Sequence, residues 1–348
     1  MPNIVDIDRN FNTATAPVDH LKFYSVLEAP FSLYGVFFEN GLFRRMPETV
    51  AKGVSERVYD LHTNTAGGRV KFVTDSRFIA VRAKYKDIGR MPHFTLAGSA
   101  GFDLYTGKDE IYCSTYVPPY ELTDSYTGLK PLAGKALREI TINLPLYSSL
   151  SSLEIGLEEN AVVEKTAGYA YEKPMVFYGS SITQGGCASR PGNAYTNALS
   201  RRLNIDHINL GFSGNCKAEE AMGQYIAQLP MSVFIFDYDH NAPDVAYLKK
   251  THERLFRTVR EANPELPIVI LSRPEYNLNK EERQRRAVIR KTYRDARAAG
   301  DKNVYFLDGP QLMKLAGHEG TVDGCHPNDI GFFSMTKALE KLIKPLLK

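Results

Sequence analysis

The 348-residue chain contains no tryptophan, no long apolar run, no block of like charge and no low-complexity tract. A membrane-spanning helix needs roughly 18 or more consecutive apolar residues, so none is expected. The opening segment has no apolar run after a basic start and therefore gives no sign of a secretory signal. These absences predict a cytoplasmic, globular protein that does not enter a membrane.

Cysteine is also scarce. The four cysteines, Cys113, Cys187, Cys216 and Cys325, form neither a CxxC pair nor a spacing typical of zinc sites. The eight histidines lie far apart in sequence, and no HExxH motif occurs. Because disulfides are rare in reducing compartments, we expect free thiols. Because no spacing typical of a metal site occurs, we expect no bound metal.

The charges are balanced, with 43 basic and 40 acidic residues and a formal net charge of +3. They are spread along the chain, so we expect no binding to nucleic acid or to a membrane surface. Apolar residues make up 43% and charged residues 24%, which is ordinary for a folded soluble protein. The length is about twice that of a typical compact domain and predicts two domains.

The first part of the chain, residues 1–165, contains short strand-like runs separated by Gly, Pro, Asn and Asp. Between residues 78 and 85, apolar side chains alternate with Arg82 and Lys84, as in a strand with one face in water. Further strands are predicted at 31–38, 69–73, 111–117 and 138–144. The pattern favours an antiparallel β-sandwich without a long amphipathic helix.

The second part, residues 173–348, alternates short apolar runs with helical segments. Buried strands are predicted at 175–178, 207–210, 232–237, 267–271 and 303–307, and helices at 218–229, 244–262, 280–299 and 329–346. Five buried strands alternating with helices indicate an α/β fold with a parallel sheet covered on both faces. Ligands of such a sheet bind at the carboxyl ends of the strands.

The first of these strands runs into a turn of small residues, Gly179-Ser180-Ser181-Ile182-Thr183. A serine in this turn has an exposed hydroxyl at the carboxyl edge of the sheet, where backbone N–H groups converge. Small residues also suit any strand-to-helix turn, so this signal is weak by itself. The turn lacks the spacing of dinucleotide and phosphate-binding loops, and no organic cofactor is expected.

Two further strand ends carry groups that can donate hydrogen bonds. Gly214 follows the second strand, and its backbone N–H can approach an oxyanion closely. Asn241 follows the third strand and offers a side-chain amide to the same oxyanion. Both residue types are also common in ordinary turns.

The segment Asp323-Gly324-Cys325-His326-Pro327 precedes the last helix. A neutral imidazole can take a proton from serine when a carboxylate holds its tautomer, and a separation of three residues lets one loop supply both groups. This loop follows the fifth strand and is therefore expected at the same edge as Ser181. Four weak signals, each at the end of a strand, combine into one strong prediction.

In this order the segments resemble the four sequence blocks of the SGNH (GDSL-like) hydrolases. The resemblance implies a three-layer α/β/α, flavodoxin-like domain in which Ser181, Asp323 and His326 form a catalytic triad. It also implies an oxyanion hole made by the amides of Ser181 and Gly214 and by the Asn241 side chain. Ser180 departs from the pattern, because many members have Asp there.

The front part resembles the GxDLY domain that precedes some SGNH enzymes, through Gly101-Phe102-Asp103-Leu104-Tyr105 and through Leu144-Pro145-Leu146-Tyr147. This likeness implies a jelly-roll-like β-sandwich that binds carbohydrate, covers the active site as a lid, or only supports the fold. Related two-domain enzymes include carbohydrate O-acetyl esterases. We therefore expect an esterase that deacetylates oligosaccharides such as manno- or xylo-oligosaccharides.

Other interpretations remain open. The same triad serves acyltransferases that pass the acyl group to a sugar or a small metabolite, and it serves general short-chain esterases. A Cys–His enzyme is conceivable because Cys325 adjoins His326, although adjacent side chains usually point apart. A binding protein with a decayed active site is less favoured, because every motif residue is present. A homodimer is expected only because closed dimers are the commonest assemblies.

Overall fold

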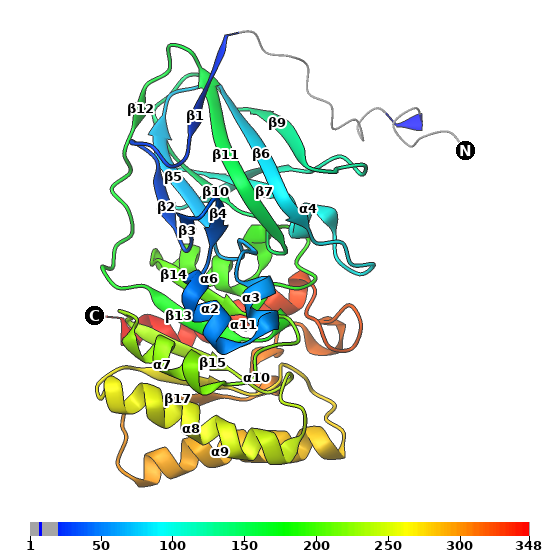
Figure 1. Ribbon diagram of the computed structural model, residues 1–348, viewed down its shortest axis with the longest axis vertical. Helices are drawn as coiled ribbons and strands as arrows, with labels where there is room; N and C mark the ends of the chain where they lie inside the picture. Colours follow the sequence, from blue (N-terminus) through cyan, green and yellow to red (C-terminus); the bar gives the residue numbers. More distant parts are fainter. Residues whose placement is uncertain (1–6, 9–19, 348) are drawn as a thin grey trace.

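The computed structural model describes residues 7, 8 and 20–347. Most of the opening segment, in which we expect no signal, therefore lies outside the described residues. The front part of the chain is stacked on the α/β part along the long axis of the molecule, and α8 and α9 form the layer farthest from it (Figure 1). Across the described ranges, no helix is both long and apolar enough to cross a membrane.

The front part contains two antiparallel sheets that enclose one apolar core. The first sheet has the order β1 (Leu21–Ser25), β11 (Ser148–Glu158), β6 (Phe78–Ile88) and β9 (Ser125–Pro131). The second has the order β12 (Val163–Glu164), β5 (Arg69–Thr74), β10 (Arg138–Asn143), β7 (Phe102–Thr106) and β8 (Ile111–Tyr116), with β2 (Ser32–Tyr34) paired to β5. The predicted β-sandwich is confirmed, and along β6 the buried Val81, Ala83 and Tyr85 alternate as expected with the more exposed Arg82 and Lys84.

The prediction of one strand at residues 31–38 is wrong. Two short strands, β2 and β3 (Phe37–Glu39), replace it, and β3 forms a hairpin with β4 (Leu42–Arg44). Gly35 separates β2 from β3 with a φ of +70°, in the left-handed region that favours glycine. A side chain there would also collide with the carbonyl oxygen of Gly67, which lies 2.1 Å from the position of a Cβ.

Three short helices of the front part were not foreseen: α2 (Glu48–Val54), α3 (Glu56–Leu61) and α4 (Leu96–Ser99). Their apolar faces are too short to show a helical period in the sequence. Ala51 of α2 and Val58 of α3 are fully buried in the same core as the strands of the α/β part. These two helices therefore pack on the second half of the chain.

The α/β part contains a five-stranded parallel sheet, as predicted. Its order is β14 (His207–Gly211), β13 (Met175–Gly179), β15 (Val233–Asp237), β16 (Ile268–Leu271) and β17 (Val304–Leu307). The longer helices are α6 (Tyr195–Leu203), α7 (Glu220–Gln228), α8 (Val245–Ala262), α9 (Lys280–Ala298) and α11 (Asp329–Ile343). Short helical turns are α5 (Ser181–Gln184), η2 (Pro191–Asn193), α10 (Gly309–Leu312), η3 (Gly317–Glu319) and η4 (Lys344–Leu346).

Strand residues alternate between the two faces of this sheet. Met175 and Phe177 of β13 are buried against α6 and α11, whereas Val176 and Tyr178 are buried against α7, α8 and α9. In the order of the chain the strands are arranged 2-1-3-4-5, so the topology reverses beside β13. The carboxyl end of β13 is thus the expected position of a ligand site.

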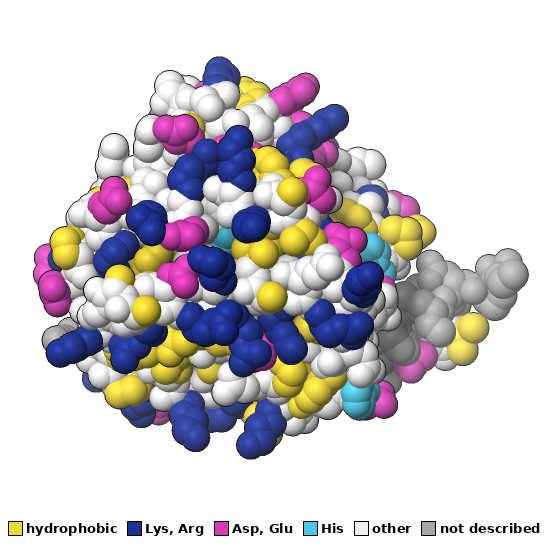
Figure 2. All heavy atoms as spheres, turned by 90° about the horizontal axis from the view of Figure 1, so that it is seen from below, with side chains coloured by type: hydrophobic (Ala, Val, Ile, Leu, Met, Phe, Trp, Pro, Cys, Tyr) yellow, Lys and Arg dark blue, Asp and Glu magenta, His cyan; other side chains and the backbone are white. Residues whose placement is uncertain are grey.

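The outer face of α8 and α9 carries basic side chains among acidic ones (Figure 2). Several form ion pairs within one turn of helix, for example Arg257 with Glu253 and Lys291 with Asp295. Exposed pairs of this kind contribute little to stability.

Two buried arginines of the front part cover the open edge of the parallel sheet. The Arg45 guanidinium donates hydrogen bonds to the carbonyl oxygens of Asn209 and Gly211 on β14, at 3.1 and 2.6 Å. Arg69 donates to the carbonyl oxygen of His207 at 3.2 Å. These three residues are two apart along β14, so their carbonyls all point outward from the sheet. The outward carbonyl groups of β14 are therefore paired by side chains of the front part.

We predict that Arg45→Met destabilises the protein by about 2 to 4 kcal/mol, because buried carbonyl groups lose a charged donor. Burial already lowers the pKa of Arg45 to about 9, which shows how completely this side chain is removed from water. Urea unfolding followed by circular dichroism measures the change. The matched control is Arg77→Met, which removes an exposed pair with Glu158 and should leave the free energy of unfolding nearly unchanged. Equal losses in the two variants would contradict a special role for the covered edge.

Candidate active site

Ser181 lies at the start of α5, directly after β13. The preceding residue, Ser180, caps this short helix by accepting a hydrogen bond from the amide of Ile182 at 3.2 Å. Gly185 ends the helix in the left-handed conformation with a φ of +107°. The turn therefore holds Ser181 at the carboxyl edge of the sheet, with 8% of its surface exposed.

Asp323 and His326 lie on the loop before α11. Oδ1 of Asp323 accepts hydrogen bonds from the backbone amides of Cys325 at 3.0 Å and His326 at 2.7 Å. The aspartate thus closes its own loop and positions the histidine backbone. Its second oxygen, Oδ2, remains for the His326 ring, whose Nδ1 lies 2.7 Å away.

The three side chains form one continuous chain of polar contacts. His326 Nε2 lies 2.9 Å from Ser181 Oγ, and His326 Nδ1 faces Asp323. In this geometry the ring nitrogen toward Ser181 can accept a proton, while the nitrogen toward Asp323 keeps its own. The structure therefore brings together all three residues that the sequence nominated as a triad.

Asp323 is suited to remain negatively charged. Burial alone would raise its pKa, but hydrogen bonds from the backbone and ring of His326 and from the amide of Cys325 outweigh that effect. The result is a pKa of about 2. Above that pH the carboxylate is ionised and can stabilise a positive charge on the adjacent imidazole.

The two other predicted donors also lie at strand ends. Gly214 has a φ of +69°, and a Cβ added there would meet no atom within 4 Å, so its backbone conformation alone requires glycine. Oδ1 of Asn241 accepts a hydrogen bond from the amide of Cys216 at 3.2 Å. That bond fixes the side-chain amide and leaves its Nδ2 group as the donor available to a ligand.

Gln184 connects the serine turn to the Gly214 loop. Its Oε1 accepts a hydrogen bond from the amide of Ser213 at 3.0 Å, and its Nε2 donates to Asn64 of the front part at 3.1 Å. Gln184 is fully buried. A single side chain thus connects the turn of Ser181, the loop of Gly214 and the front part.

The front part lines the cleft beside Ser181, which the sequence did not reveal. This cleft has a volume of about 460 Å³. Its walls are Arg57, Asp60, Leu61, Met91, His93, Phe94 and Tyr147 from the front part, and Ser213, Asn215 and His326 from the α/β part. The Tyr147 hydroxyl donates to the carbonyl oxygen of Ser181 at 3.2 Å, so the segment ending in Tyr147 reaches the turn that contains Ser181.

The Gly-Phe-Asp-Leu-Tyr motif joins the two parts. Asp103 on β7 is fully buried and accepts hydrogen bonds from Arg190 at 2.7 Å and from the amide of Gly192 at 2.8 Å. Asn143 donates a third bond at 2.8 Å. Burial raises the pKa of Asp103, while Arg190 and the other donors oppose that shift. The motif therefore anchors the segment that connects α5 to α6.

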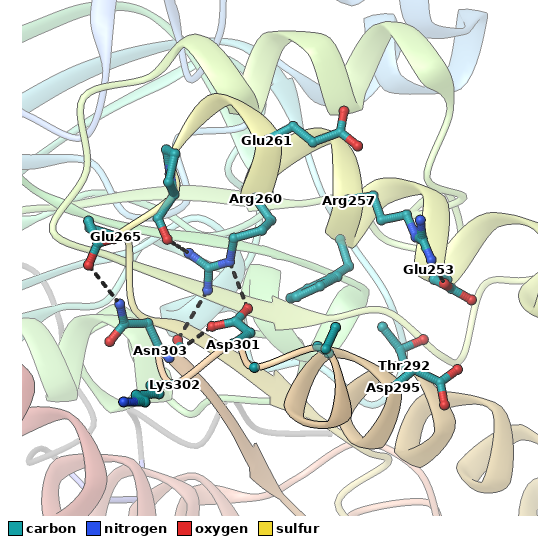
Figure 3. A pocket seen from close by; sticks show the side chains of 15 residues that line it. Glu253, Arg257, Arg260, Glu261, Glu265, Thr292, Asp295, Asp301, Lys302 and Asn303 are labelled. Carbon is teal, nitrogen blue, oxygen red and sulfur yellow. Dashed lines mark hydrogen bonds and ion pairs between the residues drawn. The ribbon is translucent and has the colours of Figure 1, made fainter.

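A larger cavity, of about 650 Å³, lies elsewhere in the α/β part. Its labelled residues come from the carboxyl-terminal halves of α8 and α9 and from the segments before β16 and β17 (Figure 3). Arg260 and Asp301 form an ion pair of 2.8 Å within it. Because β16 and β17 begin here, this cavity lies at the amino edge of the sheet, opposite to Ser181, and is not part of the candidate active site.

Asp237, at the carboxyl end of β15, supports the serine turn through Thr183, whose hydroxyl donates to its Oδ2 at 2.8 Å. Complete burial raises its pKa from 3.8 to about 7, although the bond from Thr183 opposes the shift. Its Oδ1 is buried and makes no hydrogen bond within residues 7, 8 and 20–347. The folded protein therefore holds a proton on Asp237 at pH values where the unfolded chain loses it.

This shift predicts that Asp237 destabilises the protein as pH rises. Its stabilising effect is complete below the unfolded pKa of 3.8 and is lost as pH increases through the folded pKa of about 7. Asp237→Asn should therefore be more stable than wild type at pH about 8, by at least about 1 kcal/mol relative to their difference at pH about 4. Urea unfolding at several pH values measures this, and parallel curves for the two proteins would disprove it.

A parallel sheet of this order, with a serine, a histidine and an aspartate in line at its carboxyl edge, has the architecture of a flavodoxin-like serine hydrolase. The comparisons with known proteins agree. The sequence model of the GDSL-like lipase/acylhydrolase family matches residues 172–344, and the GxDLY model, the N-terminus of SGNH hydrolase-type esterases, matches residues 21–163. The chain belongs to the GDSL-like, or SGNH, family of ester hydrolases. No curated protein matches it.

Three solved structures illustrate the likeness. A protein from Bacteroides ovatus ATCC 8483, named as a GDSL-like lipase, is 30% identical over 94% of this chain and 99% of its own, with a TM-score of 0.84. The salicylyl-acyltransferase SsfX3 of a tetracycline biosynthetic pathway is 20% identical over 95% and 98%, with a TM-score of 0.74. The acetyl xylan esterase Est2A of Butyrivibrio proteoclasticus is 12% identical over 93% and 98%, with a TM-score of 0.60. The last two show a shared fold alone.

Proposed function

We propose that this protein is a serine esterase that removes O-acetyl groups from carbohydrate, with Ser181, His326 and Asp323 as its catalytic triad. The observation that carries the proposal is the contact chain from Ser181 Oγ to His326 and on to Asp323, at 2.9 and 2.7 Å. Both distances are within normal hydrogen-bond range, so proton transfer needs no rearrangement of the loop.

In the first step, Ser181 Oγ attacks the ester carbonyl carbon while its proton moves to His326 Nε2. The carbonyl oxygen becomes an oxyanion, which the amides of Ser181 and Gly214 and the Nδ2 group of Asn241 stabilise. The C–O bond to the sugar then breaks, and the sugar oxygen takes the proton from His326. The acyl group remains on Ser181 and the sugar leaves as a free alcohol.

In the second step, a water molecule attacks the acyl-enzyme and gives its proton to His326. Collapse of the second oxyanion returns that proton to Ser181 Oγ and releases the carboxylic acid. Asp323 stays ionised throughout and stabilises the imidazolium that forms in both steps.

The choice of carbohydrate rests on the cleft and on the relatives. Phe94 and Tyr147 offer aromatic surface beside His326, and Arg57, Asp60 and Asn215 offer polar groups around it. Sugars present apolar faces together with hydroxyl groups, so such a mixture suits them. Structures with the same fold include carbohydrate esterases, one of which was solved with cellohexaose. These features support acetylated manno- or xylo-oligosaccharides as substrates.

The second candidate function is acyl transfer to a sugar or metabolite hydroxyl. The observation that favours it is the apolar wall of Leu61, Met91 and Phe94, which the front part places beside His326. An apolar wall lowers access of water to an acyl-enzyme and thereby favours another acceptor. The same residues would perform both reactions, which differ only in what attacks in the second step. A general short-chain esterase, the remaining alternative, would act on esters without a sugar and would not pass the acyl group to another alcohol.

The proposed oxyanion donor Gly214 is tested by replacing this glycine with alanine. Gly214→Ala introduces strain at a φ of +69° without a steric collision, and Gly41→Ala does the same at +78° in the hairpin of the front part. Both variants should lose a similar stability of about 1 kcal/mol. Of these two variants, only Gly214→Ala should also lower kcat.

The Asn241 side chain is tested separately. Asn241→Ala should lower kcat by about 10² to 10³ without unfolding the protein. Full activity of Asn241→Ala on a good substrate would show that its assignment is wrong.

The function is tested by measuring acetate release from acetylated manno- and xylo-oligosaccharides, with p-nitrophenyl acetate as a generic ester. We expect release from the sugars that disappears in Ser181→Ala, because the acyl-enzyme cannot form. Activity on the generic ester alone would retain the triad and exclude the sugar. A second series with an added alcohol acceptor separates the alternatives, because a transferase forms acyl-acceptor in place of acetate.

A further inference from the structure

Three metal-binding side chains from separate loops meet beside the catalytic residues. They are His93 of the front part, Cys187 after α5, and His326. One ligand atom of each, an imidazole nitrogen or the thiol sulfur, lies within 4.8 Å of the other two. These residues are 94 and 139 positions apart in the chain, so no spacing in the sequence could reveal them.

We propose that this cluster is a binding site for Zn²⁺, and that zinc bound there inhibits the enzyme reversibly. Two imidazoles and a thiolate form a ligand set characteristic of zinc. In the proposed esterase mechanism, Cys187 and His93 perform no step. The inhibitory part of the inference rests on the proposed role of His326, whereas zinc binding itself does not.

The geometry requires only a small adjustment. Ligand atoms around tetrahedral zinc are about 3.3 to 3.8 Å apart, because Zn–N and Zn–S bonds measure about 2.0 to 2.3 Å. The three atoms must therefore close by about 1 Å. His93 can supply this movement, since 37% of its side chain is exposed in the cleft. Asp323 Oδ2, 3.9 Å from His93 Nε2, or water would take the fourth position.

Zinc on His326 prevents catalysis whichever ring nitrogen it occupies. If zinc binds Nε2, that nitrogen has no lone pair left for the Ser181 proton. If zinc binds Nδ1, the neutral ring carries its hydrogen on Nε2, which then donates to Ser181 and cannot accept from it. Zinc at Nδ1 also displaces the contact with Asp323. Zinc binding and base catalysis are thus mutually exclusive.

Cys187 is buried, with 7% of its surface exposed, and lies beside the two imidazoles. Its thiol must release its proton when zinc binds. Its backbone is held at a φ of +69°, which is uncommon for a residue other than glycine.

The test measures binding and inhibition separately. Co²⁺ replaces Zn²⁺ as a spectroscopic probe, and its thiolate charge-transfer absorption should appear in wild type and disappear in Cys187→Ser. Zn²⁺ should inhibit ester hydrolysis, and a chelator should restore it. Each variant is compared with its own zinc-free rate. Loss of an outer hydrogen-bond partner alone weakens metal sites by about 10- to 100-fold, so loss of a ligand in Cys187→Ser or His93→Gln should weaken zinc inhibition at least that much.

Cys113→Ser and His20→Gln are matched controls, because both residues are exposed and belong to the sandwich away from the cleft. Both controls should keep the Co²⁺ absorption and the zinc inhibition of wild type. Absence of the absorption in wild type, or equal zinc inhibition in Cys187→Ser and wild type, would overturn the proposal. The absorption in a protein that hydrolyses no ester would support the metal site while rejecting the proposed function.

Discussion

The hydrogen bonds from Arg45 and Arg69 to the edge of β14 are the interaction on which the rest of this structure depends. A parallel sheet with an uncovered edge exposes a row of carbonyl and amide groups, which must be paired or solvated. Here the guanidinium groups of two arginines, each residue 2% exposed, donate hydrogen bonds to the outward carbonyls of His207, Asn209 and Gly211. Because the sandwich supplies these donors, its position relative to the sheet is set by backbone hydrogen bonding.

That position brings the sandwich to the catalytic edge. Arg45 contacts Gly211, directly before the segment that contains Gly214, and Tyr147 contacts the carbonyl of Ser181. Asp103 adds a buried charged contact to Arg190 on the opposite side of the serine turn. Removing either partner of such a pair leaves a buried charge without compensation, so the contact also fixes relative orientation. The sandwich thus forms one wall of the cleft, and an inert support would not need these contacts.

Much of the fold was predictable because it depends on local patterns. The five parallel strands are short, mostly apolar and followed by small or polar residues, and their ends indicated Ser181, Gly214, Asn241 and the loop of Asp323 and His326. Helices α2 and α3 were missed, since six or seven residues cannot display a helical period. The single strand predicted at residues 31–38 is wrong because Gly35, with a φ of +70°, interrupts it.

The cleft was less predictable than the triad for a different reason. His93 and Phe94 lie in a loop between β6 and α4, and nothing in their neighbours distinguishes them from surface residues. Their position follows from the docking of two structural layers, which depends on Arg45, Arg69 and Asp103 together. The Gly-Phe-Asp-Leu-Tyr motif of the sequence resembles that of other front domains, but only the structure shows that Asp103 forms hydrogen bonds with Arg190 and Gly192 of the hydrolase part.

The replacement of aspartate by Ser180 has an electrostatic consequence for the proposed reaction. A carboxylate at this position would place a negative charge one residue from the nucleophile, where the oxyanion must form. Ser180 provides the helix cap with a neutral oxygen instead. Burial also raises the pKa of Asp237 to about 7 and of Asp239 to about 6, and it lowers the pKa of His240 to about 3.

Asp237, which accepts a hydrogen bond from Thr183 of the serine turn, is therefore largely neutral under mildly acidic conditions, whereas Asp323 remains charged beside His326. Its charge lies on the far side of the imidazole from Ser181, because it contacts Nδ1 while Ser181 contacts Nε2. In that position it stabilises the imidazolium more than it repels the oxyanion, since Coulomb energy falls with distance. The distribution of charge, and not only the identity of the three residues, thus supports the role proposed for Ser181.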